Sequence, residues 1–286
     1  MKAIKKLGEG SFGEVWLFEK EAPKFAVKLL KDKSKEEDLI REAEILHILS
    51  YKNSDEFNDC NSFIVCSYGI QNTSLGVGLV MEYLSGYTLE DIYEKYRDIG
   101  VSIQPKNLYI FMYHIFQGLK YMHSKGIVHR DIKDSNIMFS DTKIKIIDMG
   151  FACKYKNDSN SLQCINPFGT PLFLAPEIYV DFHDYDAKPP TYPPKILKNM
   201  GLLKKADVWA AGAICWELIS LDDPPNPENV HSQNDMDKFA MDIKTKTHSW
   251  LLEILSYTMK YDPKKRSSAK NIVKALNQSY IVKEFS

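Results

Sequence analysis

Two acids, an amide and a cation lie close together near the middle of the chain. Asp131, Lys133 and Asn136 fall in the run 129–136, and Asp148 follows shortly afterwards. Asp131 can take a proton from a hydroxyl, and Lys133 can neutralise a phosphate in transit. Asn136 and Asp148 offer oxygen ligands to a hard divalent cation. Because phosphoryl transfer asks a protein mainly for positioning and charge stabilisation, this run predicts that reaction.

A glycine-rich stretch near the N-terminus could hold phosphates. Gly8, Gly10 and Gly13 have the spacing G-x-G-x-x-G, which in dinucleotide-binding folds follows a strand and opens a helix. Here the following residues, 15–18, are β-prone. The spacing therefore predicts a hairpin whose backbone N–H groups approach phosphates from above. An ordinary glycine-rich turn is the alternative interpretation of this motif alone.

A lysine and a glutamate farther along the chain are placed to meet. Alternation along the next expected strand puts Ala26 and Lys28 on one face, where the small residue leaves room for a flat base. Residues 35–50 have helical periodicity, and Glu42 shares the buried stripe of leucines. A lone buried carboxylate is costly, so the sequence predicts that Glu42 pairs with Lys28. An exposed lysine and a solvated glutamate are the alternatives.

The remaining elements frame these groups. Strands are expected at about 63–70 and 76–83, after a polar surface loop at 51–62. From Pro105 to Gly126 the apolar residues recur at helical spacing, which predicts a long core helix that delivers the chain to His129.

Bulk composition excludes several classes of protein. The 286 residues carry a formal net charge of −1, so no global field favours nucleic acid or anionic lipid. No apolar run reaches the roughly 18 residues of a membrane span, and the N-terminus lacks the apolar region of a secretory signal. The five cysteines show no C-x-x-C spacing, so we expect neither a disulfide framework nor a zinc site. A reducing compartment is therefore predicted: the cytoplasm, with a nuclear location left open by the basic cluster at 262–266.

The motifs stand in the order found in eukaryotic-type protein kinases, and the chain resembles that family from residue 8 to residue 266. The resemblance rests on the glycine loop, Lys28, Glu42, H-R-D-x-x-x-x-N at 129–136, D-x-G at 148–150, A-P-E at 175–177, the helix that opens at Asp207, and Arg266. So many matches in the right order make chance implausible.

This resemblance implies an α+β fold with two lobes in a single protein kinase domain over 1–286. The N-lobe, about 1–82, would be a small antiparallel β-sheet with one helix. A hinge at about 82–86 would connect it to a larger, mainly helical C-lobe at about 87–286. The short flanks outside the motifs lead us to expect no attached regulatory domain.

The resemblance also implies ATP and Mg²⁺ as cofactors and protein substrates as partners. Asp131 would orient and deprotonate the substrate hydroxyl, and Lys28, held by Glu42, would contact the α/β-phosphates. The residues implied for catalysis are Asp131, Lys133, Lys28 and Thr170, and those implied for metal binding are Asn136 and Asp148. The residues implied for nucleotide binding are Leu7, Gly8, Glu9, Gly10, Ser11, Phe12, Gly13, Glu14, Val15, Ala26, Lys28, Glu42, Met81 as gatekeeper, Glu82, Leu84, Met138 and Asp148.

The position of Lys133, two residues after Asp131, resembles the serine/threonine class, and Thr170 supports this because it can hydrogen-bond Asp131 and Lys133. In the family a buried arginine pairs with the A-P-E glutamate, which implies that Arg266 pairs with Glu177. We therefore expect an active serine/threonine kinase. A nucleotide-binding pseudokinase scaffold and a small-molecule kinase of similar fold are the alternatives.

Three positions depart from the family pattern. Met149 replaces the usual phenylalanine of D-F-G, and its adaptable side chain should preserve the packing. Asn166 sits where many kinases carry an activating phosphate that Arg130 would meet. We therefore predict activity without phosphorylation there, or activation through Ser159, Ser161 or Tyr155. Ser135 stands where some basophilic kinases keep an acid, so that route to recognising a substrate arginine is missing.

Two regions are not explained by the resemblance. Residues 181–205 form an insert, whose proline-rich part at 185–200 includes the PPxY pattern that WW domains recognise. A docking partner there and a stiff surface loop are both compatible with this short motif. Residues 221–249 are hard to place from the sequence alone.

Overall fold

The computed structural model describes residues 1–10, 13–19, 23–30, 36–50, 60–140, 143–154, 164, 169–179, 199–244 and 247–284. Predictions for Ser11, Phe12 and Asn166 lie outside these residues. The same holds for the three candidate phosphorylation sites between 155 and 161, for most of the polar loop at 51–62, and for nearly all of the proline-rich insert.

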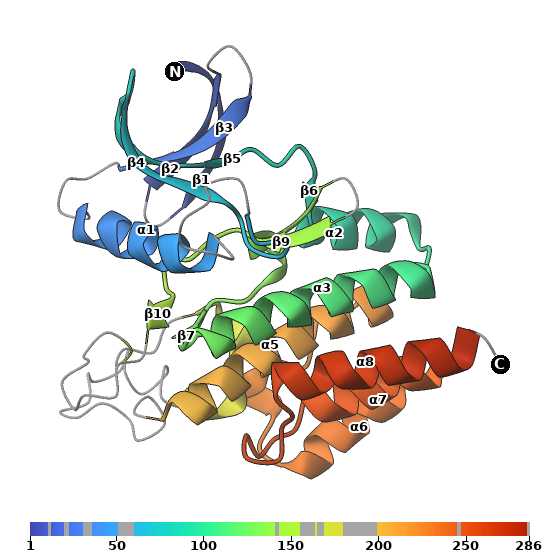
Figure 1. Ribbon diagram of the computed structural model, residues 1–286. Helices are drawn as coiled ribbons and strands as arrows, with labels where there is room; N and C mark the ends of the chain where they lie inside the picture. Colours follow the sequence, from blue (N-terminus) through green and yellow to red (C-terminus); the bar gives the residue numbers. More distant parts are fainter. Residues whose placement is uncertain are drawn as a thin grey trace.

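The N-terminal region is a five-stranded antiparallel sheet in the order β1-β2-β3-β5-β4 (Figure 1). Its strands are β1 (Lys2–Gly10), β2 (Gly13–Glu19), β3 (Lys24–Leu29), β4 (Ser67–Thr73) and β5 (Gly76–Glu82). Gly10 pairs with Gly13, so the glycines end and begin adjacent antiparallel strands and the predicted hairpin is confirmed. Gly13 has φ 153°, and an added Cβ would lie 2.1 Å from the Leu29 carbonyl oxygen, so only glycine fits there.

One helix, α1 (Glu36–Ser50), packs against this sheet, as predicted (Figure 1). Its buried face consists of Leu39, Glu42, Ile45, Leu46, Leu49 and Ser50. These positions recur three and four residues apart, which is the spacing that places side chains on one side of a helix. Glu42 is thus buried because of its register among the leucines.

The C-terminal region is mainly helical (Figure 1). Its helices are α2 (Leu89–Ile99), α3 (Pro105–Ser124), α5 (Met200–Ser220), α6 (Gln233–Ile243), α7 (Ser249–Thr258) and α8 (Ala269–Glu284). Short strands lie between them: β6 (Tyr87–Thr88), β7 (Ile127–Val128), β8 (Ile137–Ser140), β9 (Lys143–Ile146) and β10 (Cys153–Lys154). Together the two regions have the small-sheet and large-helical arrangement that the resemblance implied.

Helices α3 and α5 form the centre of the helical region. The predicted start of α3 at Pro105 is confirmed, and one face of α3 is buried, including Leu108, Phe111, Met112 and Ile115. Helix α5 is buried on nearly all sides. It begins at Met200, not at Asp207, so the last residues of the supposed insert are helical. The side chain of Asn199 caps this helix by accepting a hydrogen bond from the Leu202 N–H at 3.3 Å.

The hard-to-place region 221–249 contains regular structure. A 3₁₀ turn (Pro227–Asn229) precedes α6, whose N-cap Ser232 accepts a hydrogen bond from the Asp235 N–H. Strand β4 starts at Ser67, later than the predicted 63, because the residues before it cross to the other region: the Val65 N–H donates to the Ile146 carbonyl at 2.9 Å.

The expectation of unpaired cysteines was wrong. Disulfides join Cys60 to Cys66 and Cys153 to Cys164, and Cys215 is free and buried. The second pair joins cysteines on separate segments, which spacing along the sequence does not reveal. In the described part of the chain, no group of three or more His, Cys, Asp or Glu side chains is arranged to hold a metal ion. None of the described helices has the length and apolar character needed to span a membrane.

Candidate active site

The run 129–136 is held in place by a buried acid on helix α5. Asp207 accepts hydrogen bonds from the N–H groups of His129, at 3.0 Å, and Arg130, at 2.9 Å. Burial would raise the pKa of Asp207, but His123, whose Nε2 lies 2.8 Å away, and the His129 N–H lower it below its ordinary value. Arg130 has φ 69°, an unfavourable conformation for a residue with a Cβ. The bonds to Asp207 fix this conformation, and with it the direction of the next residue, Asp131.

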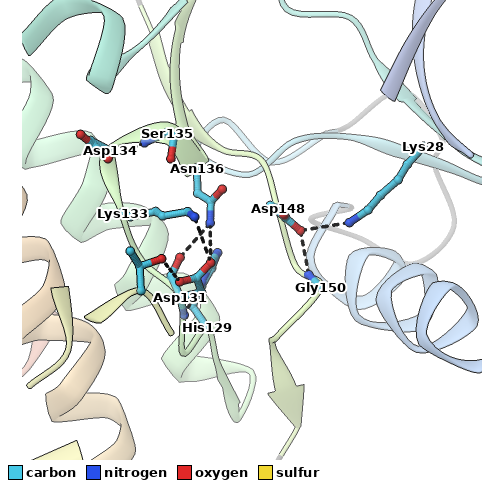
Figure 2. Close-up of polar contacts among 10 residues, drawn as sticks. Lys28, His129, Asp131, Lys133, Asp134, Ser135, Asn136, Asp148 and Gly150 are labelled. Carbon is cyan, nitrogen blue, oxygen red and sulfur yellow. Dashed lines mark hydrogen bonds and ion pairs between the residues drawn. The ribbon is translucent and has the colours of Figure 1, made fainter. Parts of the chain in front are cut away.

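Asp131 is surrounded by the groups that the sequence predicted. The amide nitrogen of Asn136 donates to the Asp131 backbone carbonyl at 2.9 Å and to its Oδ2 at 3.1 Å. The Thr170 hydroxyl donates to Asp131 Oδ1 at 2.9 Å, and the Lys133 ammonium lies 3.7 Å from Oδ2. The predicted contact between Thr170 and Asp131 is therefore confirmed. Figure 2 shows Lys133 and Asn136 pointing toward Asp131.

The predicted pair between Lys28 and Glu42 is also confirmed, with the ammonium 2.7 Å from Glu42 Oε2. The same ammonium lies 3.2 Å from Asp148 Oδ1, and Figure 2 shows it reaching toward that acid. Burial alone would lower the pKa of Lys28, but the two carboxylates raise it, so the lysine is charged. Lys28 therefore connects strand β3, helix α1 and the D-x-G segment.

Asp148 is an ionised acid at the edge of this site. Burial would raise its pKa, but Lys28 and the Gly150 N–H, which donates at 2.9 Å, hold the pKa below its ordinary value. Its side chain is 38% exposed, so a ligand can reach it.

The donor set fits the magnesium ion that the family implies. Asn136 uses its amide nitrogen for Asp131, which turns the amide oxygen away from that acid, on the side of Asp148 in Figure 2. An amide oxygen and a carboxylate are hard oxygen ligands of the kind that Mg²⁺ takes. This ion usually keeps several waters and binds through one or two protein groups plus phosphates.

The residues predicted for nucleotide binding lie on the sheet and at its junction with the helical region. Leu7, Gly8 and Glu9 are on β1, and Glu14 and Val15 are on β2. Cross-strand pairs join Val15 to Lys28 and Ala26 to Met81, and Met138 is on β8. Glu82 ends β5, and Leu84 lies two residues later in the chain. Most of the residues predicted to bind the nucleotide therefore come from strands β1, β2, β3 and β5, which are neighbours in that order in the sheet.

Several contacts at this junction were missed by the sequence reasoning. The Glu82 carboxylate accepts a hydrogen bond from the Cys66 N–H at 2.7 Å and forms an ion pair with Lys145. The Glu82 N–H donates to the Cys66 carbonyl at 2.9 Å. Asp134, in the run 129–136, was given no role from the sequence; burial raises its pKa to about 6.

The predicted pair between Arg266 and Glu177 is confirmed in bidentate form. The two guanidinium nitrogens lie 2.7 and 3.0 Å from the two carboxylate oxygens. The same guanidinium donates to the carbonyls of Lys260 and Lys205, and it lies 5.0 Å from the ring centre of Trp209. This contact fixes the A-P-E segment to the loop before α8.

Comparison with known proteins agrees with the geometry. A family model described as protein kinase domain matches residues 1–281. The chain is 27% identical over 281 residues to a probable serine/threonine-protein kinase of Dictyostelium discoideum, covering 94% of this chain and 49% of that protein. It is 29% identical to calcium-dependent protein kinase 5 of Plasmodium berghei (97% of this chain, 45% of the relative). Serine/threonine-protein kinase CST20 of Candida albicans is 31% identical (77% and 16%). The chain thus spans less than half the length of each of these relatives.

Proposed function

The chain belongs to the protein kinase family, and from that premise we propose that it is an active serine/threonine kinase that transfers the γ-phosphate of ATP to protein hydroxyls. The observation that carries the proposal is the simultaneous presence of two assemblies: Lys28 in contact with Glu42 and Asp148, and Asp131 in contact with Asn136 and Thr170. Protein kinases need the lysine–glutamate pair and the metal-binding aspartate in place together.

In the proposed mechanism Asp131 accepts the proton of the substrate hydroxyl while that oxygen attacks phosphorus. Asn136 and Thr170 hold the carboxylate in one orientation, so it need not reorganise when the substrate arrives. Lys133, 3.7 Å from the same carboxylate, supplies a positive charge where the transferred phosphoryl group passes.

Lys28 binds the remaining phosphates in this mechanism. Its ammonium is held by Glu42, and two acids keep it charged, so its position and charge are set before the nucleotide binds. Asn136 and Asp148 would hold Mg²⁺, which when bound neutralises phosphate charge. The Glu82 N–H is used by Cys66, so the Glu82 carbonyl and the Leu84 backbone are the groups proposed to meet the adenine edge.

Serine/threonine specificity is supported by Lys133 and Thr170, and by relatives whose printed names are serine/threonine kinases. A pseudokinase scaffold is the second candidate, but every group that the transfer reaction needs is present. Residue 166 is an asparagine, so activation by a phosphate at that position is not available to this chain. The cytoplasmic location and the docking role of the proline-rich insert stay predictions.

Radiolabel transfer tests this proposal. The chain is incubated with γ-labelled ATP, Mg²⁺ and generic protein substrates, and the labelled residues are identified by phosphoamino acid analysis. We expect label on serine and threonine, and none with an Asp148→Asn variant. Nucleotide binding without any labelling of protein would favour a pseudokinase scaffold instead. Label found only on small molecules would favour a small-molecule kinase of similar fold.

A further inference from the structure

A disulfide joins Cys164, which precedes Thr170 in the chain, to strand β10, which pairs with the strand before the catalytic loop. Cys153 and Cys164 are bonded, and both are buried, with exposed fractions of 1% and 2%. Cys153 lies on β10, where it pairs with Val128 of β7. Strand β7 runs directly into His129. One half of the disulfide is therefore built into the strand pair that carries the catalytic loop.

The other half lies shortly before the residues that contact Asp131. Thr170 donates to the Asp131 carboxylate at 2.9 Å. Gly169 has φ 140°, and a Cβ added to it would lie 2.9 Å from the Arg130 carbonyl oxygen, so the backbone there passes close along the catalytic loop. Cys164 is therefore bonded to strand β10, while Gly169 and Thr170 contact the catalytic loop itself.

A hydrogen bond from Arg130 also holds the chain just before Cys153 against the catalytic loop. Its Nε donates to the Phe151 carbonyl at 2.7 Å, two residues before the half-cystine. The resemblance implies that this arginine would meet an activating phosphate, but residue 166 is an asparagine. A covalent bond at Cys164 can supply the positional constraint that a phosphate at this asparagine cannot.

We propose that Cys153 and Cys164 form a reversible disulfide modification site that controls binding of the protein substrate, with glutathione disulfide as the co-reactant. The inference rests on the proposed kinase function. A protein thiolate attacks glutathione disulfide, which gives a mixed disulfide and one glutathione. The second protein thiolate then attacks the protein sulfur of the mixed disulfide, which closes the bond and releases a second glutathione. Two protein thiols are oxidised, one glutathione disulfide is reduced, and the two thiol protons end on the two glutathiones.

The bonded state is the substrate-competent one. The contacts of Asp131 with Thr170 and of Lys28 with Glu42 coexist with the disulfide. Opening the bond releases Cys164 from Cys153 of strand β10. We therefore expect reduction to raise the KM for a protein substrate by roughly five-fold or more, the low end of typical coupling between sites. Nucleotide affinity should stay the same, because Lys28 and Asp148 are held by other elements.

The second disulfide provides a matched control. Cys66 exchanges hydrogen bonds with Glu82, at the predicted hinge, and is bonded to Cys60. Substituting Cys60 therefore removes a disulfide of the same protein without touching the chain before Thr170.

The experiment uses the full chain equilibrated with reduced or oxidised glutathione. Non-reducing digestion and mass spectrometry identify linked peptides, and the KM for dephosphorylated casein and the nucleotide Kd are measured on the same samples. We expect a Cys153–Cys164 link in the oxidised sample and a lower casein KM. Cys153→Ser and Cys164→Ser should each show the higher KM in both samples, whereas Cys60→Ser should keep the wild-type response.

Two results would overturn the inference: free Cys153 and Cys164 thiols after oxidation, or a complete link with an unchanged casein KM. The wild-type comparison needs no substitution, so poor folding of a variant does not obscure the result. Absence of transfer in every sample would instead contradict the proposed kinase function, while peptide mapping would still decide whether this site is modified.

Discussion

Two buried cations, one in each region of the molecule, are paired with carboxylates in different ways. Arg266 meets both oxygens of Glu177, and its other N–H groups are used by backbone carbonyls. Lys28 meets one oxygen of Glu42, and the same ammonium also contacts Asp148, whose side chain is 38% exposed. All the partners of Arg266 named here are protein groups, whereas Lys28 also contacts Asp148, which solvent and ligands can reach.

This difference separates a structural pair from a functional one. A bidentate guanidinium with additional carbonyl acceptors compensates for its desolvation inside the protein. Removing it leaves the partly buried carboxylate of Glu177, 13% exposed, without its cation. An ammonium shared between two acids can exchange one of them for a phosphate without leaving the other. Burial alone would not distinguish the pairs, because Lys28 and Arg266 are both buried.

The largest effect is expected from breaking the structural pair. Arg266→Ala should lower the free energy of unfolding by about 3–5 kcal/mol, because Glu177 loses its cationic partner. Urea unfolding measures this, with the exposed neighbour Lys265→Ala as the control. If Arg266→Ala lowers the free energy of unfolding no more than Lys265→Ala does, the Arg266–Glu177 pair is not a structural pair.

The activity that depends on the Lys28–Glu42 pair should fall when the shape of the cation changes, even if its positive charge is kept. Lys28→Arg keeps a positive charge beside Glu42 but replaces a compact ammonium with a larger planar group. We expect kcat/KM for phosphoryl transfer to fall about 100-fold, as for other misplaced catalytic groups. The free energy of unfolding should change little. The exposed Lys24→Arg on the same strand should leave both unchanged. Equal activity of the two variants would contradict the assignment of Lys28.

A third buried acid extends the comparison because the charge of Arg97 offsets the effect of its burial only in part. Glu217 on α5 is 2% exposed, and its Oε2 has no hydrogen-bond partner among the described residues. Burial, reinforced by Asp134 and Asp223, raises its pKa to about 9. The folded protein therefore keeps a proton that the unfolded chain loses near pH 4. The stability that this group contributes is present at low pH and is lost as pH rises toward 9, by up to about 1.4 kcal/mol per pH unit.

Glu217→Gln should remove this dependence. The variant should gain stability over the wild type steadily between pH 5 and pH 8, as measured by urea unfolding at each pH. A difference between the two proteins that does not change with pH would mean that Glu217 is already ionised in the folded state.

The sequence predicted the parts of this molecule that depend on local pattern. The leucine register of α1 identified Glu42 as buried, and Pro105 marked the start of α3. The start of α5 was missed because the proline-rich region before it suggested a continuous loop. Asn199, a good helix N-cap, was the signal that could have placed the start of α5 at Met200.

Apart from the pair between Lys28 and Glu42, which the leucine register indicated, contacts between distant segments were predictable only where the family resemblance supplied them. Arg266 and Glu177 were paired in this way, as were Thr170 and Asp131. The Cys153–Cys164 disulfide and the ion pair between Lys145 and Glu82 have no local signature, because their partners meet only after the chain has folded.

The most direct test of the central claim compares two acids of the catalytic loop. Asp131→Asn and Asp134→Asn each replace a buried carboxylate with an amide of the same shape. Transfer of γ-phosphate to protein is measured for both, with nucleotide Kd as the control for folding. We predict that Asp131→Asn lowers kcat by roughly 100-fold or more at unchanged nucleotide Kd, while Asp134→Asn stays close to the wild type. Transfer by Asp131→Asn at the wild-type rate would contradict the role of Asp131 as the base.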